Sequence, residues 1–289
     1  MKKKAVSLLW VLLLFVGVNA AQADTSVWKV VKGENHLFIG GTIHVLSKSD
    51  YPLPAAFENA YRQSAIVVLE TDMQKMQTPE FQALLQSKIV YTEGRSLKTV
   101  LKKTTYQALE EHMSSRGLPI ANFEQLKPGM VAITLTMFEL QRLGLVGTGV
   151  DEFFSLKARD DGKAIGQLES AEKQLAFLST LGDGREDALI TETLSEIQQL
   201  PQLMTALKAA WRQGDRGKIK ELAITPIEKD FPNVYQQLIV QRNMDWIPEI
   251  ENMLKTKEVE FILVGAAHLV GEEGILAQLV ARGYTIESP

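Results

Sequence analysis

The apolar residues of this chain follow a strand-like pattern at both ends and a helix-like pattern between them. Near the start, Trp28–Lys32 and Leu37–Ile39 are short β-prone runs on either side of the turn-forming triplet Gly33-Glu34-Asn35, which predicts a hairpin. Near the end, Val259–Val264 is a mostly apolar run typical of a buried strand, and Tyr284–Ile286 is a last short candidate. Both ends of the chain are therefore predicted to form strands.

Two internal runs are also predicted to be strands, and each ends in Leu-Glu. Ala65–Leu69 is continuously apolar, which is the pattern of a strand covered on both faces, and Glu70 follows it. Lys163–Leu168 is a second short candidate, and Glu169 follows it. The two glutamates are thus expected at the ends of strands.

Helical spacing dominates the rest of the chain, with long segments at residues 78–126 and 170–254. Strands followed by helices and a return to strand predict an α/β or α+β fold with helical additions. We interpret one apolar stripe of the second segment as core packing; it consists of Leu203, Met204, Leu207 and Trp211. Shorter helices are predicted at Pro54–Gln63, Pro128–Leu143, Glu152–Arg159 with Asp151 as its cap, and Leu269–Arg282.

The first 23 residues have the pattern of a secretory signal peptide, which leaves residues 24–289 as the folded domain. Three lysines are followed by the apolar run Ala5–Val18 and by the small-x-small cleavage site Ala21-Gln22-Ala23. The run of about 14 residues is shorter than the roughly 20 that a membrane-spanning helix needs. We expect a periplasmic or secreted protein with no stable membrane anchor after signal cleavage; an uncleaved N-terminal anchor is the alternative.

Composition and charge exclude several classes of function. The 289 residues carry 31 basic and 35 acidic side chains, and loss of the signal lysines leaves a net charge of −7, so we expect no nucleic-acid partner. The chain has no cysteine, which excludes disulfides, thiolate metal sites and a cysteine nucleophile. Any metal site must be built from His, Asp and Glu.

The candidate chemistry lies where strands end in Gly-x-x-His. This motif occurs as Gly41-Thr42-Ile43-His44 and again as Gly265-Ala266-Ala267-His268. Glycine can adopt a positive φ, which would let the backbone turn off the strand and present the histidine over the sheet edge. Together with Glu70 and Glu169, the two histidines would converge on one edge, a donor set that suits a divalent metal ion.

Less specific interpretations of the same residues stay open. A histidine at a strand end is often a satisfied polar group, and Glu70 or Glu169 could cap the turn that follows. We interpret His36 and His112 as surface residues.

The motifs together resemble the TraB/GumN family, which includes the TIKI metalloproteases, and this chain is most similar to its secreted bacterial GumN-type members. The resemblance covers about residues 27–286 and rests on six motifs in order: GGTIH, VVLET, GVDEFF, LES followed by Gln174, QRN at 241–243, and FILVGAAHLVGEEGILAQLVARGY. It implies an α/β fold with a central mixed sheet of two pseudo-repeated halves, flanked by helices and carrying helical insertions. It also implies a metal-dependent hydrolytic site at one end of the sheet.

The resemblance further implies roles for His44, His268 and Glu70, and the chemistry of the residue types suggests roles for the others. His44, His268 and Glu70 would be ligands of a divalent metal ion, manganese or cobalt, whose bound water becomes acidic enough to react at neutral pH. Glu169 would be the general base, with Glu70 as the alternative, and Arg242 would stabilise an oxyanion or bind a carboxylate, a structural ion pair being the alternative. Asp151 and Asn243 would support the ligands or the substrate.

The function predicted from these residues is that of an exported metal-dependent hydrolase. A peptide or protein substrate is expected, as for a metallopeptidase, while the sequence leaves the oligomeric state open. The alternatives are a non-catalytic periplasmic binding or stress-interaction protein and a metal-dependent esterase. A Ser-His-Asp triad is disfavoured because the chain has no Gly-x-Ser-x-Gly motif.

Overall fold

The structure is a computed structural model in which residues 25–289 are described. The predicted signal peptide, residues 1–23, lies outside the described residues. Within residues 25–289, none of the helices combines the length and the apolar character needed to cross a lipid bilayer.

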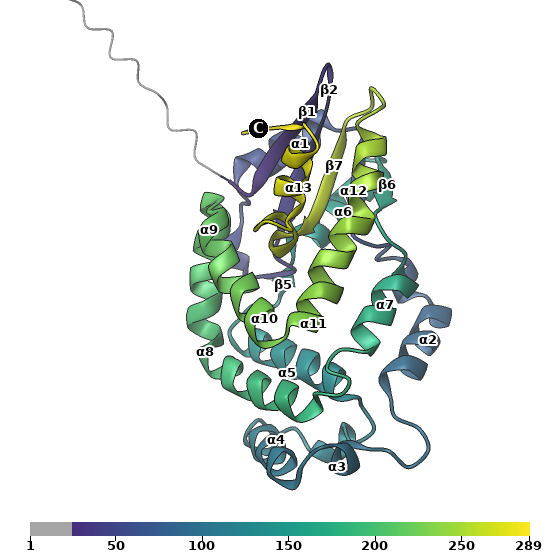
Figure 1. Ribbon diagram of the computed structural model, residues 1–289, viewed down its shortest axis with the longest axis vertical. Helices are drawn as coiled ribbons and strands as arrows, with labels where there is room; N and C mark the ends of the chain where they lie inside the picture. The colour runs from purple at the N-terminus through teal and green to yellow at the C-terminus, as the bar shows by residue number, and fades with distance from the viewer. Residues whose placement is uncertain (1–24) are drawn as a thin grey trace, which may run out of the picture.

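A six-stranded mixed sheet forms the upper part of the molecule, with helices packed around it and extending below it (Figure 1). The strand order is β6-β4-β7-β2-β1-β8, in which β6, β4, β7 and β2 are parallel to one another and β1 is antiparallel to both β2 and β8. A separate two-stranded ribbon pairs β3 with β5. The strands are β1 (Val27–Lys32), β2 (Asn35–Thr42), β3 (Val45–Leu46), β4 (Ile66–Leu69), β5 (Gly147–Thr148), β6 (Ala164–Gln167), β7 (Glu260–Gly265) and β8 (Thr285–Glu287).

The two strands that end in Gly-x-x-His are neighbours in the centre of this sheet. In the parallel pair of β2 and β7, Gly41 is opposite Val264 and Thr42 is opposite Gly265. On its other side β7 pairs with β4, where Leu69 is opposite Leu263. The carboxyl ends of three adjacent strands therefore meet at one edge, where ligands bind in open parallel sheets.

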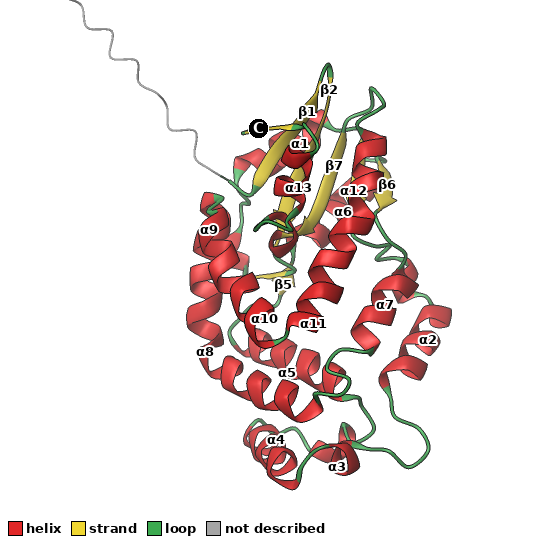
Figure 2. Cartoon of the chain, viewed as in Figure 1, coloured by secondary structure: helices red, strands yellow, loops and turns green. Residues whose placement is uncertain are grey.

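Helices cover the sheet and build a lobe beyond its carboxyl edge (Figure 2). The α-helices are α1 (Ala55–Gln63), α2 (Pro79–Ile89), α3 (Leu97–Val100), α4 (Lys103–Ser115), α5 (Pro128–Arg142), α6 (Val150–Asp160), α7 (Ala171–Ser179), α8 (Glu186–Gln213), α9 (Arg216–Ile219), α10 (Thr225–Asp230), α11 (Pro232–Tyr235), α12 (Gln241–Met253) and α13 (Ile275–Ala281). The 3-10 helices are η1 (Lys48–Asp50), η2 (Lys75–Gln77), η3 (Ile120–Asn122) and η6 (Ala266–Leu269), and the π-helical segments are η4 (Lys220–Ile224) and η5 (Gln236–Val240).

The main apolar core lies between the sheet and its helices. Phe57 of α1 packs against Phe154 of α6, Trp211 of α8 and Phe261 of β7, with ring centroids 5.5–6.3 Å apart. Trp211 also donates a hydrogen bond from its indole nitrogen to the carbonyl oxygen of Gly41. This bond fixes the end of β2 against the long helix α8, so the core also positions the strand that leads to His44.

The predicted α/β class and most predicted elements are confirmed, including the hairpin and the strands that precede Glu70 and Glu169. Two local predictions are wrong. The last helix begins at Ile275 and not at Leu269, because Gly271 has a φ of +85° and interrupts the helical backbone. Asp151 is not the cap of α6; that helix begins at Val150 with Gly149 as its N-cap, which leaves the Asp151 side chain free to bond elsewhere.

Candidate functional site

A cleft of about 710 Å³ opens at the carboxyl edge of the sheet. His44, Glu70, Arg242 and His268 line one end of it, and they come from four separate segments: the turn after β2, the end of β4, helix α12 and the 3-10 helix η6. The histidines of the two Gly-x-x-His motifs thus face the same cavity, as the sequence predicts.

His44 is the member of this group that is most open to the cleft, with 62% of its side chain exposed. Its Nδ1 lies 3.2 Å from Oδ2 of Asp151, which leaves Nε2 for the cleft. Desolvation disfavours the charged ring, but the hydrogen bond and charge of Asp151, aided by Glu70, outweigh this effect and raise the pKa of His44 to about 9. Asp151 therefore orients His44 and favours its protonated form.

Arg242 joins the two strand-end glutamates. Its Nη2 donates to Glu70 at 2.6 Å and to Glu169 at 2.7 Å, and its Nε donates to Glu169 at 3.0 Å. Burial alone would raise the pKa of Glu70, but the electrostatic effects of His268, Arg242 and His44 and the hydrogen bond from the Gly265 N–H together lower it. At Glu169 the effect of burial is larger than the opposing effect of the Arg242 guanidinium, so the pKa of Glu169 is raised. Arg242 is therefore the cation that pairs with both buried carboxylates, Glu70 and Glu169.

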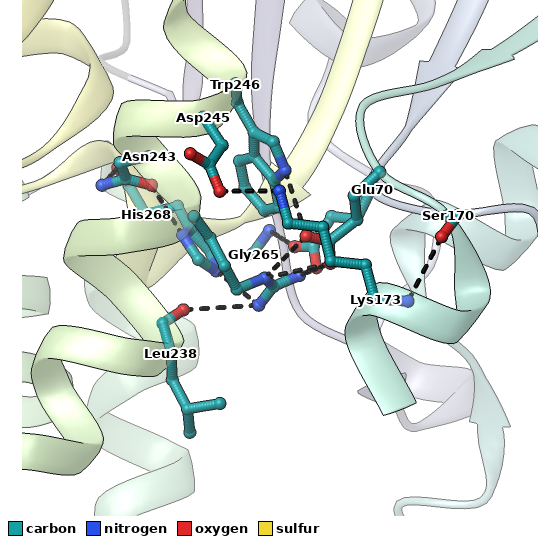
Figure 3. Close-up of polar contacts among 11 residues, drawn as sticks. Glu70, Ser170, Lys173, Leu238, Asn243, Asp245, Trp246, Gly265 and His268 are labelled. Carbon is teal, nitrogen blue, oxygen red and sulfur yellow. Dashed lines mark hydrogen bonds and ion pairs between the residues drawn. The ribbon is translucent and has the colours of Figure 1, made fainter. Parts of the chain in front are cut away.

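His268 is held on both sides of its ring (Figure 3). Nδ1 lies 2.7 Å from Oδ1 of Asn243, and Nε2 lies 3.2 Å from Nη1 of Arg242. The Asn243 amide nitrogen donates to the carbonyl oxygens of His268 and Glu273, so Oδ1 is the atom that accepts from the ring. Burial and then the charges of Arg242 and His44, opposed by that of Glu70, lower the pKa of His268 to about 3, which keeps the ring neutral.

The glycines of the two motifs are required for close approach and not for a positive φ, which corrects the reason predicted from sequence. Neither Gly41 nor Gly265 is among the described residues with positive φ. A Cβ on Gly41 would lie 3.2 Å from the Ala266 backbone, so glycine lets β2 pack against η6. A Cβ on Gly265 would lie 3.4 Å from Glu70 Oε1 and 3.6 Å from His44 Nε2. It would project into the polar end of the cleft.

Two predicted site residues lie behind the cleft surface. Glu169 has no exposed side-chain area, and it accepts hydrogen bonds from Arg242 and from the indole nitrogen of Trp246. Asn243 is also buried and contacts the cleft only through His268. In this arrangement both residues act as positioning residues, whereas Glu70, Asp151 and Arg242 line the cleft itself.

All five N–H groups of Arg242 have partners. Besides the two glutamates and His268, Nη1 also donates to the carbonyl oxygen of Leu238 at 3.4 Å. The guanidinium lies over the Trp246 ring, 4.5 Å from its centroid. A substrate oxyanion would have to displace one of these partners, so the geometry favours the structural ion pair that the sequence left as the alternative for Arg242.

Sequence reasoning did not anticipate Trp246 or the role of the apolar stripe on α8. Trp246 is fully buried beneath Arg242, and its spacing of four residues from Arg242 on one helix was the available signal. The interpretation of this stripe as core packing is confirmed for Met204 and Trp211, which belong to the main apolar core, and for Leu207, which packs against it. Met204 and Leu207 also line the cleft. His112, interpreted as a surface residue, is mostly buried beside Glu139.

The predicted metal ligands do not fit an ion in the observed arrangement. Among residues 25–289, no three His, Asp or Glu side chains are grouped closely enough to hold one. The reason lies in Arg242, whose Nη2 occupies an oxygen of Glu70 and whose Nη1 contacts Nε2 of His268. A fixed positive charge therefore stands among the three predicted ligands, where a second cation would be repelled.

The fold and the site together define an α/β protein with a polar cluster at the carboxyl edge of a parallel sheet. The chain belongs to the TraB/PrgY/gumN family, whose sequence profile matches residues 26–288. It is similar to a protein of Escherichia coli (strain K12) described as "Uncharacterized protein YbaP", with 27% identity over 256 residues that cover 86% of this chain and 89% of the relative. A protein of the same description from Shigella flexneri matches with the same identity and coverage. No solved structure matches the chain.

Proposed function

We propose that this protein is an exported hydrolase that cleaves a carboxylic amide or ester bond at the polar end of its cleft. The observation that carries the proposal is the His44–Asp151 pair, which leaves Nε2 of a solvent-accessible imidazole facing a large cavity. An imidazole whose other nitrogen is held by a carboxylate is suited to transfer protons in acyl-transfer reactions.

In this proposal His44 transfers protons, and the other residues of the site position His44 and the charges around the substrate. The neutral ring of His44, whose share grows as the pH approaches its raised pKa of about 9, takes the proton of an attacking water. The charged ring then returns that proton to the leaving oxygen or nitrogen. Asp151 holds the ring in the orientation that presents Nε2. The buried cluster of Glu70, Glu169 and Arg242 fixes the charges around the reacting carbonyl before the substrate arrives.

A peptide bond is the bond expected from the family resemblance, and an ester bond is the alternative. The divalent metal ion, manganese or cobalt, also stays a prediction from that resemblance. No step above depends on the metal ion, because Arg242 contacts Nε2 of His268 and one carboxylate oxygen of Glu70, two of the three predicted ligands. Metal analysis of the exported protein, together with melting temperatures measured with manganese and with a chelator, tests this prediction.

The experiment that tests the hydrolase proposal compares wild type with His44→Ala on a panel of peptides and carboxylic esters. We expect the substitution to lower kcat/KM by about 10²–10⁴-fold, the usual contribution of a general acid–base group. His36→Ala is the matched control, because His36 lies on the β1–β2 hairpin and does not line the cleft. Equal rates for wild type and His44→Ala would show that the proposal is wrong.

A second candidate is a periplasmic protein that binds a ligand without turnover. The hydrogen bonds of Arg242 favour this binding function. Each N–H group of its guanidinium already has a partner, so none is free to stabilise a negative charge that develops during a reaction. Such a protein would show the same ligand-dependent rise in melting temperature in wild type and in His44→Ala, with no product formed by either.

The exported location is part of the proposal and has its own test. Mass spectrometry of protein recovered from the periplasm or the medium should give a chain that begins at Asp24, as the predicted cleavage site requires. A chain that retains Met1 in the membrane fraction would instead support the uncleaved anchor.

A further inference from the structure

The cleft has a polar end and a long apolar remainder. Helices α5, α7 and α8 and the segment from α9 to η5 form its far walls, and of the side chains they place in the cleft only Gln174 is polar within the described residues. Examples are Leu140 of α5, Leu178 of α7 and Leu207 of α8. The groups able to make hydrogen bonds are thus gathered near the strand ends and the start of α6.

Four methionines give the apolar part an adaptable surface. Met73 and Met76 come from the segment between β4 and α2, Met137 from α5 and Met204 from α8. Methionine side chains are flexible and polarisable, so they fit ligands of irregular or variable shape. The volume of about 710 Å³ lies within the range of small-molecule sites.

This distribution favours a ligand with one polar group and a continuous apolar body. An extended peptide carries an N–H and a carbonyl at every residue, and burying them against apolar walls leaves them without partners. The backbone groups of the wall helices are engaged within those helices and cannot serve a peptide. A hydrocarbon chain has no such groups, so burying it against these walls has no polar cost.

The charges at the polar end select an uncharged head group. Glu70, Asp151 and Glu152 are acidic, while the cation Arg242 is already paired with Glu70 and Glu169. A free carboxylate would meet excess negative charge, whereas an ester or amide carbonyl would not. The acid released by hydrolysis would therefore be expelled from the site.

We infer that the cleft binds the ester or amide of a long aliphatic acid, with the carbonyl at His44 and the hydrocarbon chain along the methionine-lined wall. This inference names the substrate class of the proposed hydrolase and rests on that function only for the cleavage step. Binding of the aliphatic chain follows from the cleft alone and can be measured without turnover.

The first experiment measures binding to wild type and, in parallel, to His44→Ala, which should not cleave the amide. The neutral apolar dye N-phenyl-1-naphthylamine is bound, and dodecanamide, dodecanoic acid and short apolar peptides then compete for the site. We expect dodecanamide to displace the dye at concentrations at least tenfold lower than either the acid or the peptides. Failure of the dye to bind, or stronger competition by the peptides or the acid, would overturn the inference.

A pair of variants locates the binding site. Met137 of α5 lines the cleft and is 39% exposed. Leu143, the C-cap of the same helix, is 41% exposed and does not line the cleft. We expect Met137→Glu to weaken dye and dodecanamide binding at least fivefold and Leu143→Glu to leave both unchanged. Equal effects of the two substitutions would show that the ligand binds elsewhere.

The second experiment measures hydrolysis by wild type with p-nitrophenyl esters of two, four, eight and twelve carbons. We expect kcat/KM to rise at least tenfold from the acetate to the octanoate, mainly through a lower KM. Hydrolysis without chain-length dependence would contradict the inferred substrate class while leaving the hydrolase proposal intact. Selective binding of dodecanamide without hydrolysis of any ester or amide would instead contradict the hydrolase proposal and retain the aliphatic binding site.

Discussion

The Nη1 atom of Arg242 lies 3.2 Å from Nε2 of His268, and this contact determines the protonation of the imidazole. The guanidinium can only donate, so Nε2 accepts and the ring proton lies on Nδ1, where it is donated to Asn243. His268 is therefore a neutral ring whose free lone pair is already used by a cation of the protein itself. Four predicted site residues thereby form one cluster, because Arg242 also binds Glu70 and Glu169.

Competition between Arg242 and a metal ion gives the first prediction. If the guanidinium occupies the atoms that would bind a metal, Arg242→Gln should gain affinity for manganese, because it removes a positive charge and leaves Glu70, Glu169 and His268 together. We expect millimolar manganese to raise the melting temperature of Arg242→Gln by several degrees and that of wild type by less than one degree. A wild-type shift that is abolished by His44→Ala would instead support the metal site predicted from the sequence.

The same cluster predicts a large loss of stability when its cation is removed. Arg242→Met should lower the free energy of unfolding by about 3–5 kcal/mol, because two buried carboxylates lose their common partner. Urea unfolding measures the loss. Arg282→Met is the control, since Arg282 is exposed and, among residues 25–289, its side chain bonds only to groups of Gln278 one turn earlier. Equal stability of Arg242→Met and wild type would mean that the guanidinium is not the partner of both glutamates.

Gly149 gives a prediction about the position of His44. The strand pair of β3 and β5 brings Gly149 against the backbone carbonyl of His44, and a Cβ there would collide with that backbone. Gly149→Ala should displace His44 and lower hydrolysis at least tenfold. Gly166→Ala is the control, because its Cβ would make an ordinary contact of 3.4 Å with the Val68 side chain. Unchanged activity in Gly149→Ala would show that the turn carrying His44 tolerates the shift.

Glu260 predicts a pH-dependent effect on stability away from the cleft. The residue begins β7, is buried, and has an Oε2 with no hydrogen-bond partner among the described residues. Burial and then the charge of Glu258 raise its pKa. A carboxyl group whose pKa is higher in the folded protein than in the unfolded chain destabilises the fold at high pH, and this penalty disappears as the pH falls through the folded pKa.

We therefore expect Glu260→Gln to raise the melting temperature by roughly 2–4 °C at pH 8 and to have a smaller effect at pH 4. Thermal unfolding followed by circular dichroism at both pH values provides the measurement. Glu249→Gln, at an exposed position on α12, is the control and should change the melting temperature by less than one degree. A loss of stability in Glu260→Gln at pH 8 would show that the carboxylate has a partner in the folded protein.

Much of the fold could be predicted from the sequence because short-range patterns of apolar and turn-forming residues determine most of its strands and helices. The apolar run before Glu70 and the strand before His268 are both in the sheet, and the hairpin turn lies where Gly33 and Asn35 indicate. The starts of α6 and α13 depended on single backbone positions, such as the N-cap Gly149 and the positive φ of Gly271, and the periodicity of apolar residues does not reveal such positions.

The sequence predicted which residues form the candidate site better than it predicted what each of them does. Two Gly-x-x-His motifs after strands indicated that His44 and His268 share an edge, because parallel strands align their carboxyl ends. The sequence could not show that Glu169 would be buried beneath Arg242, or that Met204 and Leu207, which pack in the core, would also line a cleft. An apolar stripe on a helix looks the same in both settings.

The sequence by itself determined the family, the strands and the side chains that lie at the sheet edge, because these depend on local pattern and on motifs written in order along the chain. Only the tertiary structure decided which charges neutralise one another. The partners of Arg242 come from positions 70, 169 and 268, and the free energy of burying a charge depends on how closely such distant groups approach.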